Sequence, residues 1–521
     1  MSQSAQTAAV KPGDNIVDMA ARHGLVVTSG NQAVIDLAQR FILTSHTHGE
    51  NTDWDARVEK AFRRLFPQTG PFVDFGTPEP AMLLGPPGHG KTAVAIEAAR
   101  LAAETLGLRF VKNPNPGDRI DENCFVFIIR QTAGSTNTAL EGGMPKIVRN
   151  PDQTVHMGFV PDYRFASCQR AAASVVLWDD VGRSLDVIKS AVMKMGYEQI
   201  YNGLDLHRTA SVFTSNLGRE DLSFGSNNDD AFMTRTHRLF LLDNAEEFVQ
   251  RARARWQKDA TGVGAAGFLG FIETMGDELF RRPPRRDAGG GTTQPRTLDD
   301  LMLNIHAVVV NAGGMDRITD PVVLGEINDL AHRILEPEDA RLVELFYHTL
   351  ANGAEPIARA MVLDDKVDHA DIARRYNKGN TIEGKFFGVA LGQAVARWVA
   401  VAAARKPDET STYVRRAVDG LCQTLQDSEW SYAMDAMMVE LWDRVPSLRE
   451  PEDVSVADGF NALMRFMGRK GSLRRDVLDR IVLESRDNTL VTDRQHELFS
   501  EAMFPAKRMI LGNDGGTRRR V

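Results

Sequence analysis

Short apolar runs, separated by segments with helical spacing or turn residues, mark the candidate strands in the first half of the chain. The first run, Ala81–Leu84, follows a stretch rich in proline and glycine and ends directly at Gly85. The later runs are Cys124–Ile129, Ser174–Trp178, Ser211–Thr214 and Leu239–Leu242. Strands that alternate with helices along a chain are typical of a parallel sheet. We therefore predict an α/β fold with a mostly parallel sheet.

Apolar residues at helical spacing occur on both sides of this region. Gln32–Ile42 and Trp54–Phe66 carry that spacing, so two short helices are expected before the first strand. Residues 1 to about 30 have no strong period and are predicted to form a loose arm. Beyond the last strand, Ala245–Trp256 begins a long helical stretch. Prolines and glycines interrupt it at Arg281–Thr293, which we interpret as a surface loop.

The last third of the chain is helical in pattern. Helical spacing recurs at Gly384–Arg405, Ser411–Gln426, Ser431–Arg444 and Gly459–Met467. A chain of 521 residues is expected to form several domains. We predict four parts, an N-terminal arm with helices, an α/β core, a helical segment and an all-helical C-terminal domain, over residues 1–70, 71–243, 244–345 and 346–521.

Composition places the chain among globular proteins, with 43% hydrophobic and 25% charged residues. Cys124, Cys168 and Cys422 lie far apart and form no metal-ligand spacing, so neither a disulfide framework nor a zinc site is expected. The first residues lack the basic start and apolar run of a secretory signal, and no stretch approaches the roughly 18 apolar residues of a membrane helix. We expect a soluble, cytoplasmic protein without a membrane partner.

The residues that follow the first strand have the spacing GxxxxGK[ST] of a phosphate-binding loop. They are Gly85, Pro86, Pro87, Gly88, His89, Gly90, Lys91 and Thr92, and we call them the phosphate loop. A buried strand precedes them and the helix-forming segment Ala93–Leu106 follows, as the motif requires. The glycines let backbone N–H groups face phosphates, Lys91 supplies a charge at the β and γ oxygens, and the Thr92 hydroxyl is a Mg²⁺ ligand. A chance glycine-rich turn, the alternative, would not require strand, loop and helix to coincide.

Two carboxylates end the apolar run at Ser174–Trp178. Asp179 is the candidate to hold Mg²⁺, directly or through water, and Asp180 is the candidate to orient an attacking water. A strand that simply ends in an aspartate turn is the alternative interpretation. The order and spacing of these residues after the phosphate loop favour the functional one. We call Asp179 and Asp180 the carboxylate pair.

Polar residues near the last two strands complete the candidate site. Asn216 opens the loop after Ser211–Thr214, where its amide would position the same water, although an asparagine there is often only part of a turn. Arg235 and Arg238 precede the last strand, and either is a candidate arginine finger. A finger contributes roughly 10³- to 10⁵-fold in rate when it reaches the transferred phosphate. Taken singly, such an arginine is commonly just solvated.

Together and in this order, the four elements resemble Walker A, Walker B, sensor 1 and the arginine finger of the AAA+ superfamily, over roughly residues 70–245. Further segments are similar to its MoxR-like branch. Gly142–Val148 and Gly158–Pro161 resemble the branch's Gly-x-Pro segment and the Pro loop that follows. Phe268–Phe271 and Gln294–Thr297 resemble the FL motif and the Pro-Arg-Thr sensor 2 of its lid. The resemblance ends near residue 345.

The resemblance implies an AAA+ P-loop core with a helical lid over residues 244–345, and a homo-hexameric ring that binds ATP and Mg²⁺ at subunit boundaries. It also implies that Arg296 contacts the nucleotide from the lid and that the finger comes from the neighbouring subunit. Proteins of this branch remodel protein partners, often with a von Willebrand A-type partner. Asp180 departs from the family pattern, in which a glutamate is usual. The shorter side chain leaves the speed of hydrolysis open.

Our primary hypothesis is a Mg²⁺-ATP-hydrolysing, chaperone-like remodeller, and two other functions stay open. Basic residues at Arg281–Arg286 and Arg518–Arg520 suggest a motor or loader that acts on nucleic acid. The net charge of −8 and the pI near 5.9 argue against it, although a basic groove can occur in an acidic protein. Asp180 also suggests a nucleotide-gated scaffold that binds ATP and assembles but hydrolyses slowly.

Overall fold

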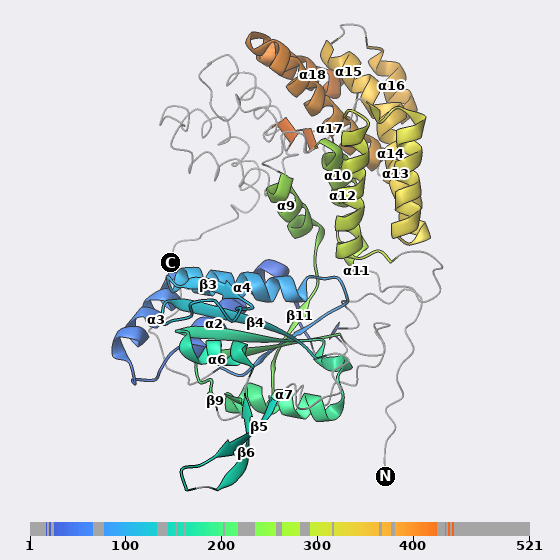
Figure 1. The fold of residues 1–521 in the computed structure, drawn as a ribbon. Helices are drawn as coiled ribbons and strands as arrows, with labels where there is room; N and C mark the ends of the chain where they lie inside the picture. The colour runs from blue at the N-terminus through green and yellow to red at the C-terminus, as the bar shows by residue number, and fades with distance from the viewer. Residues whose placement is uncertain are drawn as a thin grey trace, which may run out of the picture. The chain divides into compact units, whose positions relative to one another are not determined.

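The predicted strands lie side by side in one sheet in the computed structural model of the chain (Figure 1). The structure describes residues 25–65, 78–132, 144–152, 154–160, 162–201, 204–216, 235–256, 263–281, 292–314, 317–363, 367–376 and 381–424, and single residues at 17, 20, 21, 433, 436, 437, 440 and 441. They belong to two compact units. The first comprises the described residues of 1–247, 277–287 and 294–296, and the second those of 248–276, 288–293 and 297–521.

Within the described residues, a seven-stranded parallel sheet forms the centre of the first unit. Its strand order is β1–β11–β2–β10–β7–β4–β3, and the strands pair in parallel throughout. The strands in this order are β1 (Val27–Thr28), β11 (His237–Leu241), β2 (Ala81–Leu84), β10 (Thr209–Ser215), β7 (Ala173–Asp179), β4 (Cys124–Gln131) and β3 (Arg109–Lys112). The predicted α/β fold with a parallel sheet is confirmed, and each predicted apolar run is one of its strands.

Both faces of the sheet are buried, which explains why its strands are continuous apolar runs. In β2, Ala81 and Leu83 belong to one hydrophobic cluster, whereas Met82 and Leu84 belong to another. Successive side chains of a strand point to opposite faces, so each face of a parallel sheet needs its own cover. The helices that contribute to the first cluster are α2 (Gly30–Thr44), α3 (Thr52–Leu65) and α4 (Lys91–Thr105). Those of the second are α6 (Tyr163–Arg170) and α7 (Asp186–Glu198).

The start of the chain agrees with the prediction in its helices but not in its arm. α2 and α3 are the two helices predicted before the first strand, except that Phe66 lies outside the described residues. Instead of belonging to a loose arm, Val27 and Thr28 form β1 and pair with β11 at the sheet edge. Two residues are too few to give a periodic pattern. The short β3, at the opposite edge, is not predicted either, because both of its ends are exposed.

Among the described residues, two small hairpins lie outside the main sheet. β5 (Met144–Arg149) pairs antiparallel with β6 (Val155–Val160), and β8 (Ile200–Tyr201) with β9 (Leu204–Asp205). Figure 1 shows the β5–β6 hairpin projecting from the first unit. Its Ile147 and Val155 side chains are 72% and 60% exposed. The hydrophobic pattern predicts neither hairpin, because such short ribbons lack the regular burial that gives a strand its signature.

Helices make up the second unit, in the part of it that the structure describes. They are α10 (Val263–Met275), α12 (Pro295–Asn311), α13 (Pro321–Ile334), α14 (Pro337–Thr349), the π-helical turn Leu350–Ala354, α15 (Glu355–Leu363), α16 (His369–Tyr376), α17 (Ile382–Arg405) and α18 (Thr410–Thr424), together with most of α9 (Ala245–Trp256). α17 packs against α10, α14, α15 and α18. Its contacts make it the core helix of this unit.

Most helices predicted in the second half of the chain are present. α9, α17 and α18 correspond to the predicted segments that begin at residues 245, 384 and 411. For Ser431–Arg444 the described residues are helical, whereas Gly459–Met467 and most of the predicted loop Arg281–Thr293 lie outside the described residues. The expected domain division at residue 345 falls inside α14, and α10 and α17, from the two sides of it, pack together.

α17 carries buried charge in an apolar setting. By length and composition it could cross a membrane, but its apolar stretch is almost entirely buried inside the structure. Arg397 of α17 forms an ion pair with Glu355 of α15, and both side chains are buried. The indole N–H of Trp398 donates to the other Glu355 oxygen at 2.8 Å. The charges are thus compensated inside the unit.

Candidate functional site

The register of the strands brings polar residues together at the carboxyl edge of the sheet. Leu84 of β2 pairs with Ser215 of β10, and β10 also pairs with β7. On the far side of β7, Asp179 pairs with Gln131 of β4. The phosphate loop, Asn216 and the carboxylate pair therefore all begin at this edge. The carboxyl ends of the strands are where open parallel sheets bind ligands.

Three glycines give the phosphate loop a backbone that other residues rarely adopt. The φ angle is +146° at Gly85, +82° at Gly88 and +74° at Gly90. A Cβ atom on Gly85 would lie 2.3 Å from the carbonyl oxygen of Leu241, which is closer than real contacts allow. Gly90 is also the N-cap of α4 and makes no side-chain cap. No capping side chain therefore competes with an anion for the N–H groups of the first helical turn.

Lys91 is buried in the curve of the phosphate loop. Its ammonium group donates to the carbonyl oxygens of Gly85 at 2.7 Å and Pro86 at 2.8 Å. It also donates to Oδ1 of Asn216 at 3.0 Å. The structure thus brings together two candidate residues from distant parts of the sequence, a cation from the loop and an amide from the end of β10.

Three side chains hold the Asp179 carboxylate. Its Oδ1 accepts from Oγ1 of Thr92 at 3.3 Å and from Oγ1 of Thr214 at 2.6 Å, and its Oδ2 accepts from Nε2 of Gln131 at 2.6 Å. The two predicted Mg²⁺ ligands, Thr92 and Asp179, therefore lie next to each other. Oxygen ligands suit Mg²⁺, which takes few from the protein and completes its shell with phosphate and water. Among the described residues, no group of three or more His, Cys, Asp or Glu offers another metal site.

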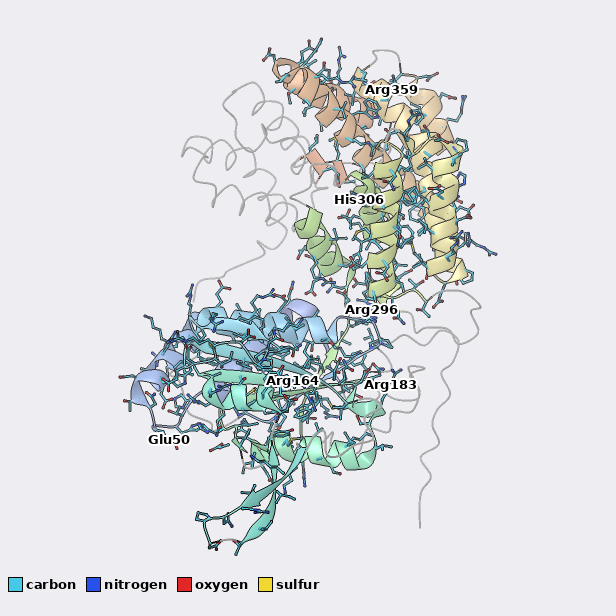
Figure 2. The ribbon with its side chains drawn as sticks, viewed as in Figure 1. Glu50, Arg164, Arg183, Arg296, His306 and Arg359 are labelled. Atoms are coloured by element: carbon cyan, nitrogen blue, oxygen red, sulfur yellow. The ribbon has the colours of Figure 1, made fainter. Side chains whose placement is uncertain are left out.

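Asp180 has a left-handed backbone, with φ 58° and ψ 39°. Its N–H donates to Oγ1 of Thr214 at 2.9 Å, and its carbonyl accepts from the N–H of Arg183 at 3.0 Å. Arg183 ends the one-turn helix that follows β7 (Figure 2). Aspartate is one of the few residues besides glycine that adopt this conformation readily. Asp180 therefore stands where the backbone favours a short polar side chain.

His89 is the buried histidine of the phosphate loop. Its Nδ1 accepts from the N–H of Asp243 at 3.1 Å, so the other ring nitrogen carries the proton of a neutral imidazole. Burial, and secondly the charge of Lys91, lowers the pKa of His89 to about 3. The imidazole is therefore neutral at physiological pH and links the loop to the chain just beyond β11.

Arg296 lies close to the phosphate loop within the first unit. It stands in the first turn of α12 and its side chain is exposed (Figure 2). A Cβ atom on Gly88 would lie 2.8 Å from Oε1 of Gln294 and 3.5 Å from Cβ of Arg296. The structure therefore places this candidate, expected from the resemblance to a lid, beside the loop.

Arg235 and Arg238 lie at the amino edge of the sheet, where the parallel strands begin. Arg238 belongs to β11 and pairs with Met82 of β2, whereas Arg235 precedes the strand. Both side chains are exposed. The phosphate loop follows the end of β2, and the two arginines lie near its beginning. The structure does not bring either of them to the loop of the same chain.

The sequence prediction missed two side chains of this site, Thr214 and Gln131. Both bond to Asp179, and both are polar residues at the carboxyl end of an apolar strand. That position is the signal that could have identified them. Thr214 is the last residue of the predicted run Ser211–Thr214, and Gln131 lies beyond the predicted end of its strand.

The remaining segments of the family resemblance lie elsewhere in the described structure. The Gly-x-Pro segment and the Pro loop fall on the β5–β6 hairpin, with Gly142, Gly143 and Pro161 outside the described residues. The FL motif lies in α10, where Phe268 and Phe271 are buried.

Comparison with known proteins adds no family assignment. No protein-family model matches the sequence, and no curated protein matches it significantly. The functional argument therefore rests on the geometry around the phosphate loop.

Proposed function

We propose that this protein is a Mg²⁺-dependent ATPase of the AAA+ type, in its MoxR-like branch. The observation that carries the proposal is the meeting of Lys91, Thr92, Asp179 and Asn216 at the carboxyl edge of a parallel sheet. A cation and a hydroxyl at the start of a helix, together with a carboxylate at the end of a nearby strand, are the groups that bind a nucleoside triphosphate with its metal. Glycines let the backbone of the loop turn its N–H groups toward phosphates, so the residues suit ATP and Mg²⁺.

Each residue then has a defined role. The loop amides and the Lys91 ammonium bind the phosphates of ATP. Thr92 and Asp179 hold Mg²⁺, which when bound neutralises charge on the β and γ phosphates. Asp180 orients the water that attacks the γ phosphate, and Asn216, whose amide lies beside Lys91, helps to position it. Arg296, next to Gly88, is the candidate to contact the nucleotide from the lid over residues 244–345.

The position of the two arginines supports assembly into a ring. Arg235 and Arg238 lie at the opposite end of the strands from the phosphate loop of their own chain. An arginine finger at either position would therefore serve a neighbouring subunit, as in a homo-hexamer. In this proposal the motor works in the cytoplasm on a protein partner or a von Willebrand A-type adaptor, and the C-terminal domain over residues 346–521 serves that partner.

Phosphate release from Mg²⁺-ATP by the full-length protein tests the proposal. Lys91→Ala should weaken ATP binding by at least about 2 kcal/mol, the scale of a charge-assisted hydrogen bond to a phosphate. Asp180→Asn should keep ATP binding and lose turnover, because it retains the size but not the charge of the side chain. Lys60→Ala, on an exposed position of α3, is the matched control and should behave as the parent. Unchanged ATP affinity in Lys91→Ala would contradict the phosphate-loop assignment.

A second candidate function is a nucleotide-gated scaffold that hydrolyses ATP slowly. The short Asp180 side chain on its left-handed backbone favours it. The same assay separates the two functions, since a scaffold binds Mg²⁺-ATP with little phosphate release. A motor on nucleic acid would instead bind DNA with a steep dependence on salt, because phosphate contacts release counterions.

A further inference from the structure

Thr214 occupies the contact between the two members of the carboxylate pair. It is the penultimate residue of β10 and is fully buried. Its Oγ1 lies 2.6 Å from Oδ1 of Asp179 and 2.9 Å from the backbone nitrogen of Asp180. A single hydroxyl group therefore contacts both consecutive residues at the end of β7.

Chemistry fixes the direction of these two hydrogen bonds. A backbone N–H only donates, so Oγ1 of Thr214 accepts from Asp180. The one hydroxyl hydrogen is then directed at Oδ1 of Asp179, which accepts it. The Thr214 hydroxyl therefore accepts from one member of the pair and donates to the other. The hydroxyl sets the rotation of the Asp179 carboxylate and also anchors the left-handed backbone of Asp180.

Two other side chains also bond to the Asp179 carboxylate, and they differ from Thr214 in burial or in bond length. Gln131 holds the second oxygen of Asp179 from β4, and its side chain is exposed. Thr92, the proposed metal ligand, approaches the first oxygen at 3.3 Å, which is longer than the 2.6 Å bond from Thr214. Of the two hydroxyls that bond to Oδ1 of Asp179, the Thr214 hydroxyl is therefore the one that is fully buried and makes the shorter hydrogen bond.

We infer that Thr214 is a positioning residue of the ATPase site, which aligns the Mg²⁺-holding carboxylate with the residue that orients the water. The inference rests on the proposed function. It predicts that loss of the hydroxyl raises the Mg²⁺ concentration needed for turnover and lowers the rate of ATP hydrolysis. The affinity for the nucleotide without the metal should be preserved. Partners that orient a metal ligand typically change metal affinity or activity by about 10- to 100-fold when they are removed.

The test compares Thr214→Val with Thr214→Ser in the full-length protein. Valine keeps the shape and removes the hydroxyl, whereas serine keeps the hydroxyl. Thr209→Val is the matched control, because Thr209 lies at the other end of β10 and its buried hydroxyl bonds to Ser174 at 2.7 Å, away from the carboxylate pair. The measurements are the Mg²⁺ concentration for half-maximal turnover, kcat and KM for ATP, and the affinity for a fluorescent ATP analogue in EDTA.

Thr214→Val should raise the Mg²⁺ requirement and lower kcat, each by about tenfold or more, and should leave the affinity in EDTA within about twofold. Thr214→Ser should retain most of the parental Mg²⁺ response, and Thr209→Val should retain it fully. A parental Mg²⁺ response in Thr214→Val would overturn the inference. If valine prevents folding, Thr214→Ala and Thr214→Ser differ by one oxygen atom, and equal Mg²⁺ responses in that pair would overturn it equally. Failure of the parent protein to bind or hydrolyse Mg²⁺-ATP would instead overturn the proposed function.

Discussion

Replacing Gly85 by alanine probes the phosphate loop through stability alone, without reference to any activity. The added Cβ would lie 2.3 Å from the Leu241 carbonyl oxygen, and ordinary contact begins near 3.4 Å, so backbone atoms must separate by about 1 Å. Both partners are constrained, because β2 and β11 are paired up to Leu84 and Phe240. The φ angle of +146° adds strain that only glycine avoids.

The expected magnitude follows from these two effects. A backbone in that region costs about 1–3 kcal/mol, and overpacking of a fixed structure costs about 1–3 kcal/mol more. Gly90→Ala is the matched control in the same loop, because its φ of +74° is strained but a Cβ there meets nothing within 4 Å. That change should cost about 1–2 kcal/mol. We therefore expect Gly85→Ala to be less stable than Gly90→Ala by about 2 kcal/mol.

Urea unfolding of both variants, followed by circular dichroism without nucleotide, measures this difference. Nucleotide is left out because a ligand that binds the folded state would add to its stability. Both changes reduce the freedom of the unfolded chain to a similar extent, so that effect cancels in the comparison. Equal unfolding midpoints for the two variants would refute the reasoning. They would mean that the ends of β2 and β11 move apart without any loss of folding stability.

Three further predictions concern the site and its assembly. Asp179→Ala should lose the Mg²⁺-dependent part of ATP binding, measured by titration with and without EDTA, because the metal loses an oxygen ligand. Arg235→Ala subunits should bind ATP but not hydrolyse it, and mixing them with Lys91→Ala subunits should restore turnover at shared sites; Arg238→Ala is tested in parallel, and mixed rings without recovered turnover would contradict a shared site. The pKa of His89 lies near 3 when folded and near 6.5 when unfolded, so only the unfolded chain takes up this proton in between and stability falls as pH falls through that window. His89→Asn should therefore flatten the pH dependence of unfolding in urea between about pH 6 and 4, by up to about 1.4 kcal/mol per pH unit.

The central strands were predictable because burial on both faces makes them apolar without interruption. β2 (Ala81–Leu84) and β7 (Ala173–Asp179) have this character. The predicted apolar runs end within about one residue of the observed ends of these two strands. β1 was not predictable, since two residues carry no period. The β5–β6 hairpin was missed for a related reason, because exposed side chains such as Ile147 are not selected by a core.

The part of the site whose residues are consecutive in sequence was predictable. The part whose residues come together only because particular strands are neighbours in the sheet was not. The phosphate loop is a continuous motif, so its position needed no fold. The bond between Thr214 and Asp179 depends on β10 lying beside β7, and the bond from Gln131 depends on β4 lying on the other side. A single sequence does not contain that order of strands. The resemblance implies that the finger serves a neighbouring subunit, but where Arg235 lies relative to its own loop follows only once β11 is known to run parallel to β2.

The buried ion pair between α15 and α17 has a consequence for how the second unit finds one arrangement. α17 is rich in alanine, valine and glycine, and such small side chains resist sliding of one helix along another less than large ones do. A slide by one helical turn, about 5.4 Å, would leave the Arg397 guanidinium and the Glu355 carboxylate buried without each other. Isolated buried charges are far more costly than small losses in packing. We expect this ion pair to fix the register in which α15 and α17 pack against each other.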